Sequence, residues 1–302
     1  MELLAGRCAI RDGDLELPRE ELLELARGVD AIVADPTVPV DEALLDAAGP
    51  GLRVVANFAV GYDNIDLDAC RRHGVVVANT PDVLTNATAE LALALTLAAA
   101  RRFTEAEGDL RAGRWRGWDP GAYLGIELTG ATFGVVGMGR IGRRYAELVV
   151  GIAGQVLYAS RTPKEDAERA LGVRRVALEE IFGRADVVSL HLPASGETTG
   201  MVGAPELAAM KPGAILVNTS RGSLVDSRAL ARALHDGEIG GAGLDVYEQE
   251  PDVPTELLEA PRCVLLPHIG SATTRSRDGM ARLVAENVLA VLEGEEPPNR
   301  VA

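Results

Sequence analysis

The sequence has few cysteines, few aromatic residues and too little positive charge to balance its acidic side chains. Its three cysteines, Cys8, Cys70 and Cys263, are odd in number, and no pair has the spacing of a metal site. They therefore predict neither a disulfide framework nor a metal centre, and they favour a reducing compartment. Because the opening stretch MELLAGRCAI also lacks the features of a secretory signal, we expect a cytoplasmic protein.

Charge and hydropathy argue against two classes of partner. Aspartate and glutamate number 45 against 30 lysines and arginines, which gives a net charge of −15. Such an acidic chain binds poorly to nucleic acid and to anionic membrane surfaces. The most apolar segment, LALALTLAAA, covers residues 91–100. A membrane-spanning helix needs about 20 residues, so this segment is too short to be one. We expect neither nucleic acid nor a membrane as a partner, and we interpret this segment as a core helix.

The 302 residues, 47% of them hydrophobic, are enough for roughly two globular domains. Strand-like and helix-like segments alternate along the whole chain, which predicts an α/β fold with parallel sheets covered by helices. Strands are expected at residues 30–35, 53–58, 75–80, 131–137, 155–160, 186–193, 214–220, 241–247 and 263–268, and long helices at 85–103 and 271–293. This pattern predicts two doubly wound units with a ligand cleft.

A glycine-rich turn follows the strand expected at residues 131–137. Gly137, Gly139 and Gly142 form the pattern G-x-G-x-x-G between that strand and a helix. The first glycine permits a tight turn, the second lets a pyrophosphate approach the backbone, and the third lets the helix pack closely on the strand. The turn therefore predicts a dinucleotide site, and the alternative is a purely structural glycine turn.

The next strand ends without the acidic residue that would bind the ribose 2′-hydroxyl of NAD. Ser160, Arg161 and Thr162 stand there instead, with Lys164 beyond them. A carboxylate would repel a 2′-phosphate, whereas a guanidinium and two hydroxyls can bind it. The sequence therefore predicts NADP(H) as the cofactor, with NADPH preferred over NADH. The alternative is an exposed surface arginine in a protein that uses NAD.

Three side chains near strand ends could carry chemistry. His268 ends the stretch CVLLPH, Arg221 follows the strand at 214–220, and Glu250 follows GLDVYEQ. An arginine can form paired hydrogen bonds with a substrate carboxylate, and a glutamate beside a histidine favours the imidazolium and orients the ring. Each also has an ordinary structural interpretation. Of the other histidines, His73 and His235 are typical of helix ends, and His191 of packing or positioning.

At these residues the chain resembles the D-isomer-specific 2-hydroxyacid dehydrogenases, and most closely their glyoxylate/hydroxypyruvate reductase branch. The similarity runs from about Pro18 to the C-terminus. It is carried by the motifs NFAVGYDNIDL, NTPDVLTNATAELALAL, GMGRIG, KPGAILVNTSRGSLVD, GAGLDVYEQEP and LPHIGSAT. The resemblance implies NADPH-dependent reduction of small 2-oxo acids such as glyoxylate and hydroxypyruvate.

The resemblance also implies roles for individual residues. Arg221 would hold the substrate carboxylate and carbonyl, His268 would donate the proton, and Glu250 would be its acidic partner. Further substrate contacts would be Val60, Gly61 and Trp118, the last reaching the neighbouring subunit's pocket in a homodimer. Cofactor contacts would be Thr88, Gly137, Gly139, Arg140, Ile141, Gly142, Ser160, Arg161, Thr162, Thr219, Ser220, Asp245 and Gly270. No metal is implied.

The resemblance further implies that a Rossmann nucleotide domain, residues 99–269, is inserted into a flavodoxin-like substrate domain, residues 1–98 and 270–302. The family opens with a strand and a helix before the segment that matches RCAIRDGD, so the substrate domain is expected to lack this first unit or the start site to be misassigned. Two alternatives to the function remain open. One is a related dehydrogenase of the 3-phosphoglycerate or D-lactate type, and the other is a dinucleotide-binding, corepressor-like interaction protein.

Overall fold

The computed structural model describes residues 3–13 and 17–302. The chain forms two compact units. Unit 1 comprises the chain up to Leu84 together with Ser271–Ala302, and unit 2 comprises Thr85–Gly270. Each unit is an α/β structure built on a parallel sheet, as the alternating pattern of the sequence predicts.

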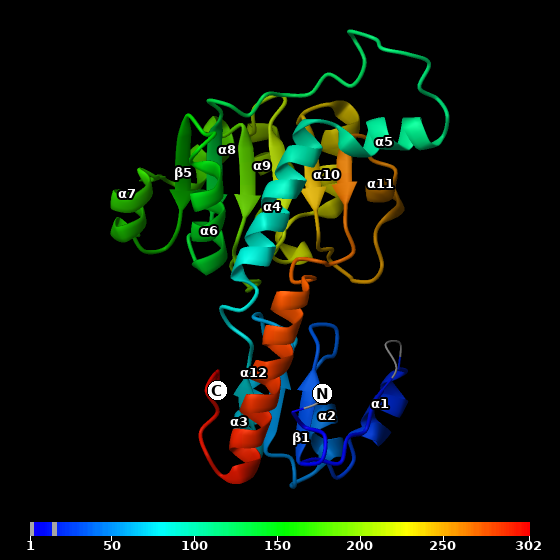
Figure 1. Ribbon diagram of the computed structural model, residues 1–302, viewed down its shortest axis with the longest axis vertical. Helices are drawn as coiled ribbons and strands as arrows, with labels where there is room; N and C mark the ends of the chain where they lie inside the picture. The colour runs from blue at the N-terminus through cyan, green and yellow to red at the C-terminus, as the bar shows by residue number, and fades with distance from the viewer. Residues whose placement is uncertain (1–2, 14–16) are drawn as a thin grey trace. The chain divides into compact units, whose positions relative to one another are not determined.

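Unit 1 is built on a three-stranded parallel sheet. Its strands β1 (Ala31–Ala34), β2 (Val54–Asn57) and β3 (Val76–Ala78) lie side by side in that order. Its helices are α1 (Arg19–Leu25), α2 (Glu42–Ala48), α3 (Leu67–His73) and α12 (Thr274–Glu293). Helix α12, drawn in orange to red, runs beside the strands of this unit in Figure 1.

Helices cover both faces of the unit 1 sheet, and the central strand β2 shows how. Val54 belongs to a core cluster with Val284 and Val288 of α12, whereas Val55 belongs to a cluster with Leu44 of α2. Successive side chains of a strand point to opposite faces, so a strand covered on both sides is apolar throughout. All four residues of β2 are accordingly buried.

Unit 2 contains a seven-stranded parallel sheet in the order β10-β9-β8-β7-β4-β5-β6. The strands are β4 (Thr132–Val136), β5 (Gln155–Ala159), β6 (Arg174–Arg175), β7 (Val187–Leu190), β8 (Ile215–Asn218), β9 (Gly241–Leu244) and β10 (Cys263–Leu265). The chain starts in the middle at β4, builds outward to β6, and then returns to add β7 to β10 on the other side. This is the strand order of the Rossmann fold, in which ligands bind at the carboxyl ends of the strands near the reversal.

Helices also cover both faces of the unit 2 sheet. They are α4 (Thr85–Ala100), α5 (Phe103–Arg111), α6 (Arg140–Val149), α7 (Glu165–Leu171), α8 (Leu178–Arg184), α9 (Ala204–Ala209), α10 (Ser227–Asp236) and α11 (Thr255–Leu258). On one face, the core includes residues of α4 and α6 with Val217 of β8. On the other face, Leu216 packs with residues of α8, α9 and α10. In Figure 1, α4 crosses the sheet of this unit.

Helix α4 belongs wholly to unit 2. A Cβ atom on Gly243 of β9 would lie only 2.9 Å from the Cβ of Leu95, so the glycine is needed for the helix to pack this closely on the strand. The units divide before α4 and after Gly270, whereas the boundaries implied by the family resemblance lie at 98/99 and 269/270. The helix also ends earlier than residue 103, because Arg102 adopts a left-handed conformation (φ 54°) that starts a new helix, α5.

Each of the nine predicted strands corresponds to an observed strand, but the sequence did not predict β6. This strand is two residues long, and both residues are arginines, so it lacks the apolar pattern by which the others were recognised. All three cysteines are unpaired. Among the described residues, none of the helices combines the length and apolar character needed to cross a membrane.

Candidate active site

Two of the three glycines in the turn after β4 are required by packing, and the third borders open space. A Cβ on Gly137, whose φ is 97°, would lie 2.4 Å from the carbonyl oxygen of His191. A Cβ on Gly142 would lie 1.9 Å from the carbonyl oxygen of Gly137. By contrast, nothing lies within 4 Å of the Cβ position of Gly139, which is the N-cap of α6 and supplies no side-chain cap. The backbone donors of this helix start can therefore meet an anionic ligand.

Other predicted cofactor residues lie at the carboxyl ends of strands in the unit 2 sheet. Ser160 follows β5, Thr219 follows β8 and Asp245 follows β9. The hydroxyl oxygen of Thr219 is buried without a hydrogen-bond partner among the described residues, so it has the capacity to bond a ligand. An open helix start and an unsatisfied hydroxyl at one edge of the sheet fit a bound dinucleotide.

Hydrogen bonds to its backbone carbonyl groups hold the segment Ser160–Thr162 in place. The Ser160 hydroxyl donates to the carbonyl oxygen of Thr162 at 2.6 Å. The Arg175 guanidinium in β6 donates to the Ser160 oxygen at 3.1 and 2.9 Å, and to the Arg161 oxygen at 3.0 Å. The side chains of Arg161 and Thr162 remain exposed. Sequence reasoning missed Arg175, which is contributed by a strand too short to recognise.

His268 and Glu250 form a hydrogen-bonded pair. The Nδ1 atom of His268 lies 2.6 Å from Oε2 of Glu250, whose other oxygen accepts from the backbone N–H of Tyr247 at 2.9 Å. Burial tends to raise the pKa of Glu250, but the hydrogen bond and the charge of His268, the Tyr247 N–H and the charge of Arg221 together lower it below its ordinary value. The structure thus brings Arg221, Glu250 and His268 together, as their positions at strand ends predict.

Arg221 is positioned by the turn that follows β8. Asn218 donates to the Arg221 carbonyl oxygen at 2.8 Å, and the Arg221 guanidinium donates to the Ser220 carbonyl oxygen at 2.7 Å. A Cβ on Gly222 would lie 1.8 Å from the backbone carbon of Tyr247, so this glycine lets the turn after β8 meet the segment that leads to Glu250. Asn218 and Gly222 are supporting residues that the sequence did not single out.

Asp245 fixes the backbone around His268. Its carboxylate accepts from the N–H groups of Ile269 and Gly270, each at 2.7 Å, and its carbonyl oxygen accepts from the His268 N–H at 2.9 Å. Thr88 in α4 completes this contact by donating to the Gly270 carbonyl oxygen at 3.2 Å. Burial raises the pKa of Asp245 to about 6. These bonds hold His268 in its left-handed conformation, with φ of 52°.

The remaining histidines have structural environments. His191 is partly buried beside the glycine turn, its Nε2 lies 2.9 Å from the Ser189 hydroxyl, and the burial of its ring lowers its pKa to about 3. His73, in the last turn of α3, contacts Glu42 of α2 at 3.0 Å. His235 lies in the last turn of α10, before Gly237. His191 is therefore a neutral packing residue, and His73 and His235 lie at helix ends.

The predicted substrate contacts outside this cluster lie in two loops. Val60 and Gly61 follow β2 in unit 1. Trp118 lies in unit 2, in the irregular segment after α5, and is 86% exposed. In Figure 1 this segment extends away from the sheet of its unit.

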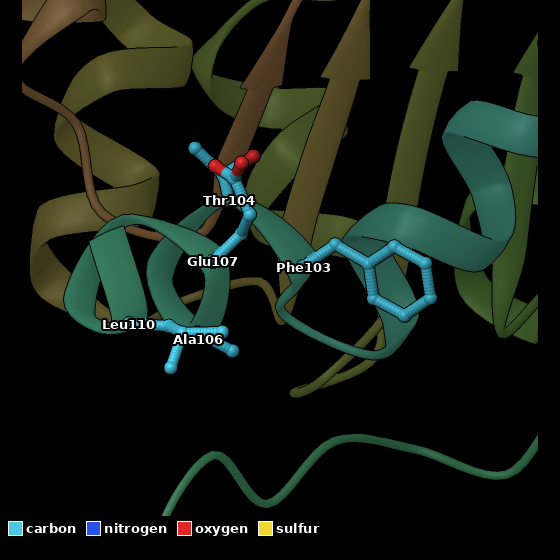
Figure 2. A pocket seen from close by; sticks show the side chains of 5 residues that line it. All are labelled: Phe103, Thr104, Ala106, Glu107 and Leu110. Atoms are coloured by element: carbon cyan, nitrogen blue, oxygen red, sulfur yellow. The ribbon is translucent and has the colours of Figure 1, made fainter. Parts of the chain in front are cut away.

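A hollow on α5 is separate from these residues. It is lined by Phe103, Thr104, Ala106, Glu107 and Leu110. Figure 2 shows Ala106 and Leu110 close together on this helix. None of the predicted catalytic, cofactor or substrate residues lines the hollow, so it is not the candidate active site.

Comparisons with known proteins show the family to which the chain belongs. Residues 93–270 match the model of the D-isomer specific 2-hydroxyacid dehydrogenase, NAD binding domain. The chain is 50% identical over 288 residues to a glyoxylate reductase of Thermococcus litoralis, with 94% of this chain and 87% of the relative covered.

Two solved structures are similar in fold. A protein from Thermus thermophilus is 46% identical, with a TM-score of 0.89, and the match covers 96% of this chain and 91% of that one. An NADPH-dependent glyoxylate/hydroxypyruvate reductase from Sinorhizobium meliloti, in complex with NADP and malonate, is 38% identical, with a TM-score of 0.83 and coverages of 95% and 86%.

Proposed function

Because this chain belongs to the D-isomer-specific 2-hydroxyacid dehydrogenase family of oxidoreductases, we propose that it reduces small 2-oxo acids, glyoxylate and hydroxypyruvate among them, with NADPH. The observation that carries the proposal is the contact between His268 and Glu250, with the charge of Arg221 acting on the same carboxylate. Arg221, Glu250 and His268 follow β8, β9 and β10, respectively, and we assign them the roles of substrate-binding cation, acidic partner and proton donor. The glycine turn opens at the same edge of the sheet.

When bound, the reduced nicotinamide supplies a hydride to the carbonyl carbon of the substrate. His268 donates a proton to the carbonyl oxygen as negative charge develops there. Its Nδ1 is engaged by Glu250, so Nε2 is the atom that gives up the proton. In the oxidation of a hydroxy acid, the neutral ring takes the proton back.

Arg221 has two roles in this mechanism. A guanidinium can bind a carboxylate through two parallel hydrogen bonds, which orients the 2-oxo acid. Its positive charge also stabilises the oxygen on which negative charge grows during the reaction. The family resemblance assigns the backbone of Val60 and Gly61 as a further contact for the substrate carboxylate.

The dinucleotide would lie along the strand ends of unit 2. Its pyrophosphate would meet the N-terminus of α6, its nicotinamide amide would meet Asp245, and its adenosine ribose would lie at Ser160–Thr162. The other contacts we assign to it are Thr88, Gly137, Gly139, Arg140, Ile141, Gly142, Thr219, Ser220 and Gly270.

We base the proposed preference for NADPH on the residues that follow β5. Arg161 and Thr162 are exposed there, and Arg175 fixes the backbone that carries them. A 2′-phosphate on the ribose would find a guanidinium and hydroxyls instead of a repelling carboxylate. The relative from S. meliloti, described as NADPH-dependent, supports this assignment.

We also propose a homodimer. Large apolar side chains are exposed along α5 and the segment after it: Phe103, Leu110, Trp115, Trp118 and Leu124. Exposed apolar surface of this kind is typical of protein interfaces, in which tryptophan is enriched. In the dimer, Trp118 would reach the substrate pocket of the neighbouring subunit.

Oxidation of NADPH by the purified protein, followed with glyoxylate and hydroxypyruvate, tests the function. Turnover with either acid, faster than with pyruvate or 3-phosphohydroxypyruvate, is the expected result. Faster turnover of the last two would assign the chain to the D-lactate or 3-phosphoglycerate type. NADPH binding without turnover of any 2-oxo acid would instead indicate a corepressor-like interaction protein.

A further inference from the structure

Three successive carbonyl groups are held in the loop that follows β2. The Ala59 oxygen accepts from the N–H of Thr80 at 3.0 Å. The Val60 oxygen accepts from the side-chain amide of Asn79 at 2.8 Å, and the Gly61 oxygen accepts from that of Asn57 at 2.7 Å. Asn57 ends β2 and Asn79 follows β3, so residues at two neighbouring strand ends hold the loop.

This arrangement fixes the direction of the backbone donors. A trans peptide is planar, so each N–H points opposite to the carbonyl of the preceding residue. The N–H groups of Val60, Gly61 and Tyr62 therefore point away from the groups that hold the carbonyls. In the part of the chain that the structure describes, these three N–H groups have no hydrogen-bond acceptor. They form a row of oriented donors that can bind an anion.

The two asparagines are themselves held firmly. Asn57 is fully buried and shares hydrogen bonds of 3.1 and 3.3 Å with Asn64, which in turn donates to the carbonyl oxygen of Asp35 at 3.0 Å. The backbone carbonyl of Asn79 accepts from Asn287 of α12 at 3.1 Å. An immobile partner keeps a loop in its binding conformation and so reduces the cost of ordering it when a ligand binds.

We propose that Asn57 and Asn79 are positioning residues, which turn the peptides at Val60–Tyr62 so that their N–H groups receive the substrate carboxylate. This inference rests on the proposed function. Neither asparagine side chain touches the substrate in this scheme. Both act through the loop carbonyls, so their loss weakens substrate binding more than it slows the chemical step.

The test compares Asn79→Ala and Asn79→Asp with the unaltered protein. The alanine variant loses one hydrogen bond to the loop, and we expect KM for glyoxylate to rise by about tenfold, with little change in kcat or in the Kd of NADPH. The aspartate variant replaces a donor with a negative charge facing the Val60 carbonyl, so its KM should rise further. The inhibition constant of oxalate, measured at fixed NADPH, should rise in parallel with KM.

Asn287→Ala is the matched control, because Asn287 holds the backbone of Asn79 without touching the loop. It should lower the unfolding temperature and raise KM much less than Asn79→Ala does, because the Asn79 side chain can still reach the Val60 carbonyl. Equal rises in KM for both alanine variants, or an unchanged KM for Asn79→Ala, would overturn the inference.

If the alanine variant does not fold, Asn79→Ser provides the same test. The serine side chain is too short for its hydroxyl to reach the Val60 carbonyl. An unaltered protein without 2-oxo acid reductase activity would overturn the proposed function itself. An active protein whose Asn79 variants keep their KM would overturn only the role of the asparagines.

Discussion

Nδ1 of His268 lies 2.6 Å from Oε2 of Glu250, and the backbone N–H of Tyr247 holds the other oxygen of the same carboxylate. The pKa of Glu250 is lowered despite its burial, so this carboxylate stays ionised through the neutral range. The contact with Nδ1 fixes the orientation of the His268 ring. In the proposed mechanism, this pair donates the proton from Nε2 of His268.

The first prediction concerns the pH dependence of this pair. At saturating NADPH, the rate of 2-oxo acid reduction should be constant at low pH and fall as His268 loses its proton, because only the imidazolium can donate. Oxidation of the hydroxy acid should show the opposite trend. Glu250→Gln removes the negative charge that favours the imidazolium, so the falling limb should move to lower pH. Steady-state rates measured across the pH range in both directions check this.

His268→Ala should lower turnover by a factor of about 10²–10⁴, the usual contribution of a positioned acid. His235→Ala is a suitable control, because His235 lies at the end of α10 outside the cluster. Wild-type turnover in His268→Ala, or an unmoved pH profile in Glu250→Gln, would exclude the proposed proton donor.

The second prediction concerns Arg221. Arg221→Ala should abolish most turnover of 2-oxo acids while NADPH still binds, because an unpaired substrate carboxylate costs about 2–5 kcal/mol. Arg221→Lys should recover only part of the activity, since an ammonium keeps the charge but not the paired hydrogen bonds. Rates and NADPH titrations of both variants give the comparison. Arg228→Ala, an exposed position on α10, is the control, and near-normal activity in Arg221→Ala would mean that another group binds the acid.

The third prediction concerns cofactor preference. Arg161→Ala should weaken NADPH binding more than NADH binding, because only NADPH carries the 2′-phosphate. Arg175→Ala should act in the same direction by releasing the carbonyls of Ser160 and Arg161. Dissociation constants for both cofactors, with Arg174→Ala as the neighbouring control, separate these effects. Equal losses for the two cofactors in Arg161→Ala would remove this residue from the 2′-phosphate site.

The fourth prediction uses the raised pKa of Asp245, about 6. The ionised carboxylate accepts hydrogen bonds, so a nicotinamide amide that donates to it binds better above this pH than below it. The affinity for NADPH should therefore fall as pH decreases through about 6. The control ligand is 2′-phospho-ADP-ribose, which has the same phosphates but no nicotinamide. Calorimetric titrations give the affinities for NADPH and for 2′-phospho-ADP-ribose at each pH. If the ratio of these affinities does not change with pH, Asp245 does not bind the nicotinamide amide.

The fifth prediction concerns the exposed segment after α5. Light scattering at micromolar concentration should give the mass of a dimer, and a monomeric mass would refute the proposed assembly. Trp118→Ala should raise KM for the 2-oxo acid, because this side chain is proposed to enter the neighbouring pocket. Trp115→Ala is the matched control, and it should change KM less. Equal effects of the two substitutions on KM would leave no specific role for Trp118.

Much of the fold could be predicted because its signals are local. Alternating apolar strands and the glycine turn identified nine of the ten strands in the described structure, and strand ends pointed to Arg221, Glu250 and His268. The supporting residues could not be predicted in this way. Asn79 acts on Val60, 19 positions away, and Arg175 acts on Ser160, 15 positions away, through hydrogen bonds that exist only after the strands have paired. Sequence periodicity does not predict such contacts.

The position and charge of strand β6 also matter for redesign of the cofactor site. It forms one border of the seven-stranded sheet, and both of its residues are exposed arginines. A short border strand that carries charge resists pairing with the sheet of another molecule, which is how many proteins avoid aggregation. Replacing Arg174 and Arg175 with apolar residues to relax cofactor choice would also remove this protection. Such variants are therefore expected to be less soluble at high concentration.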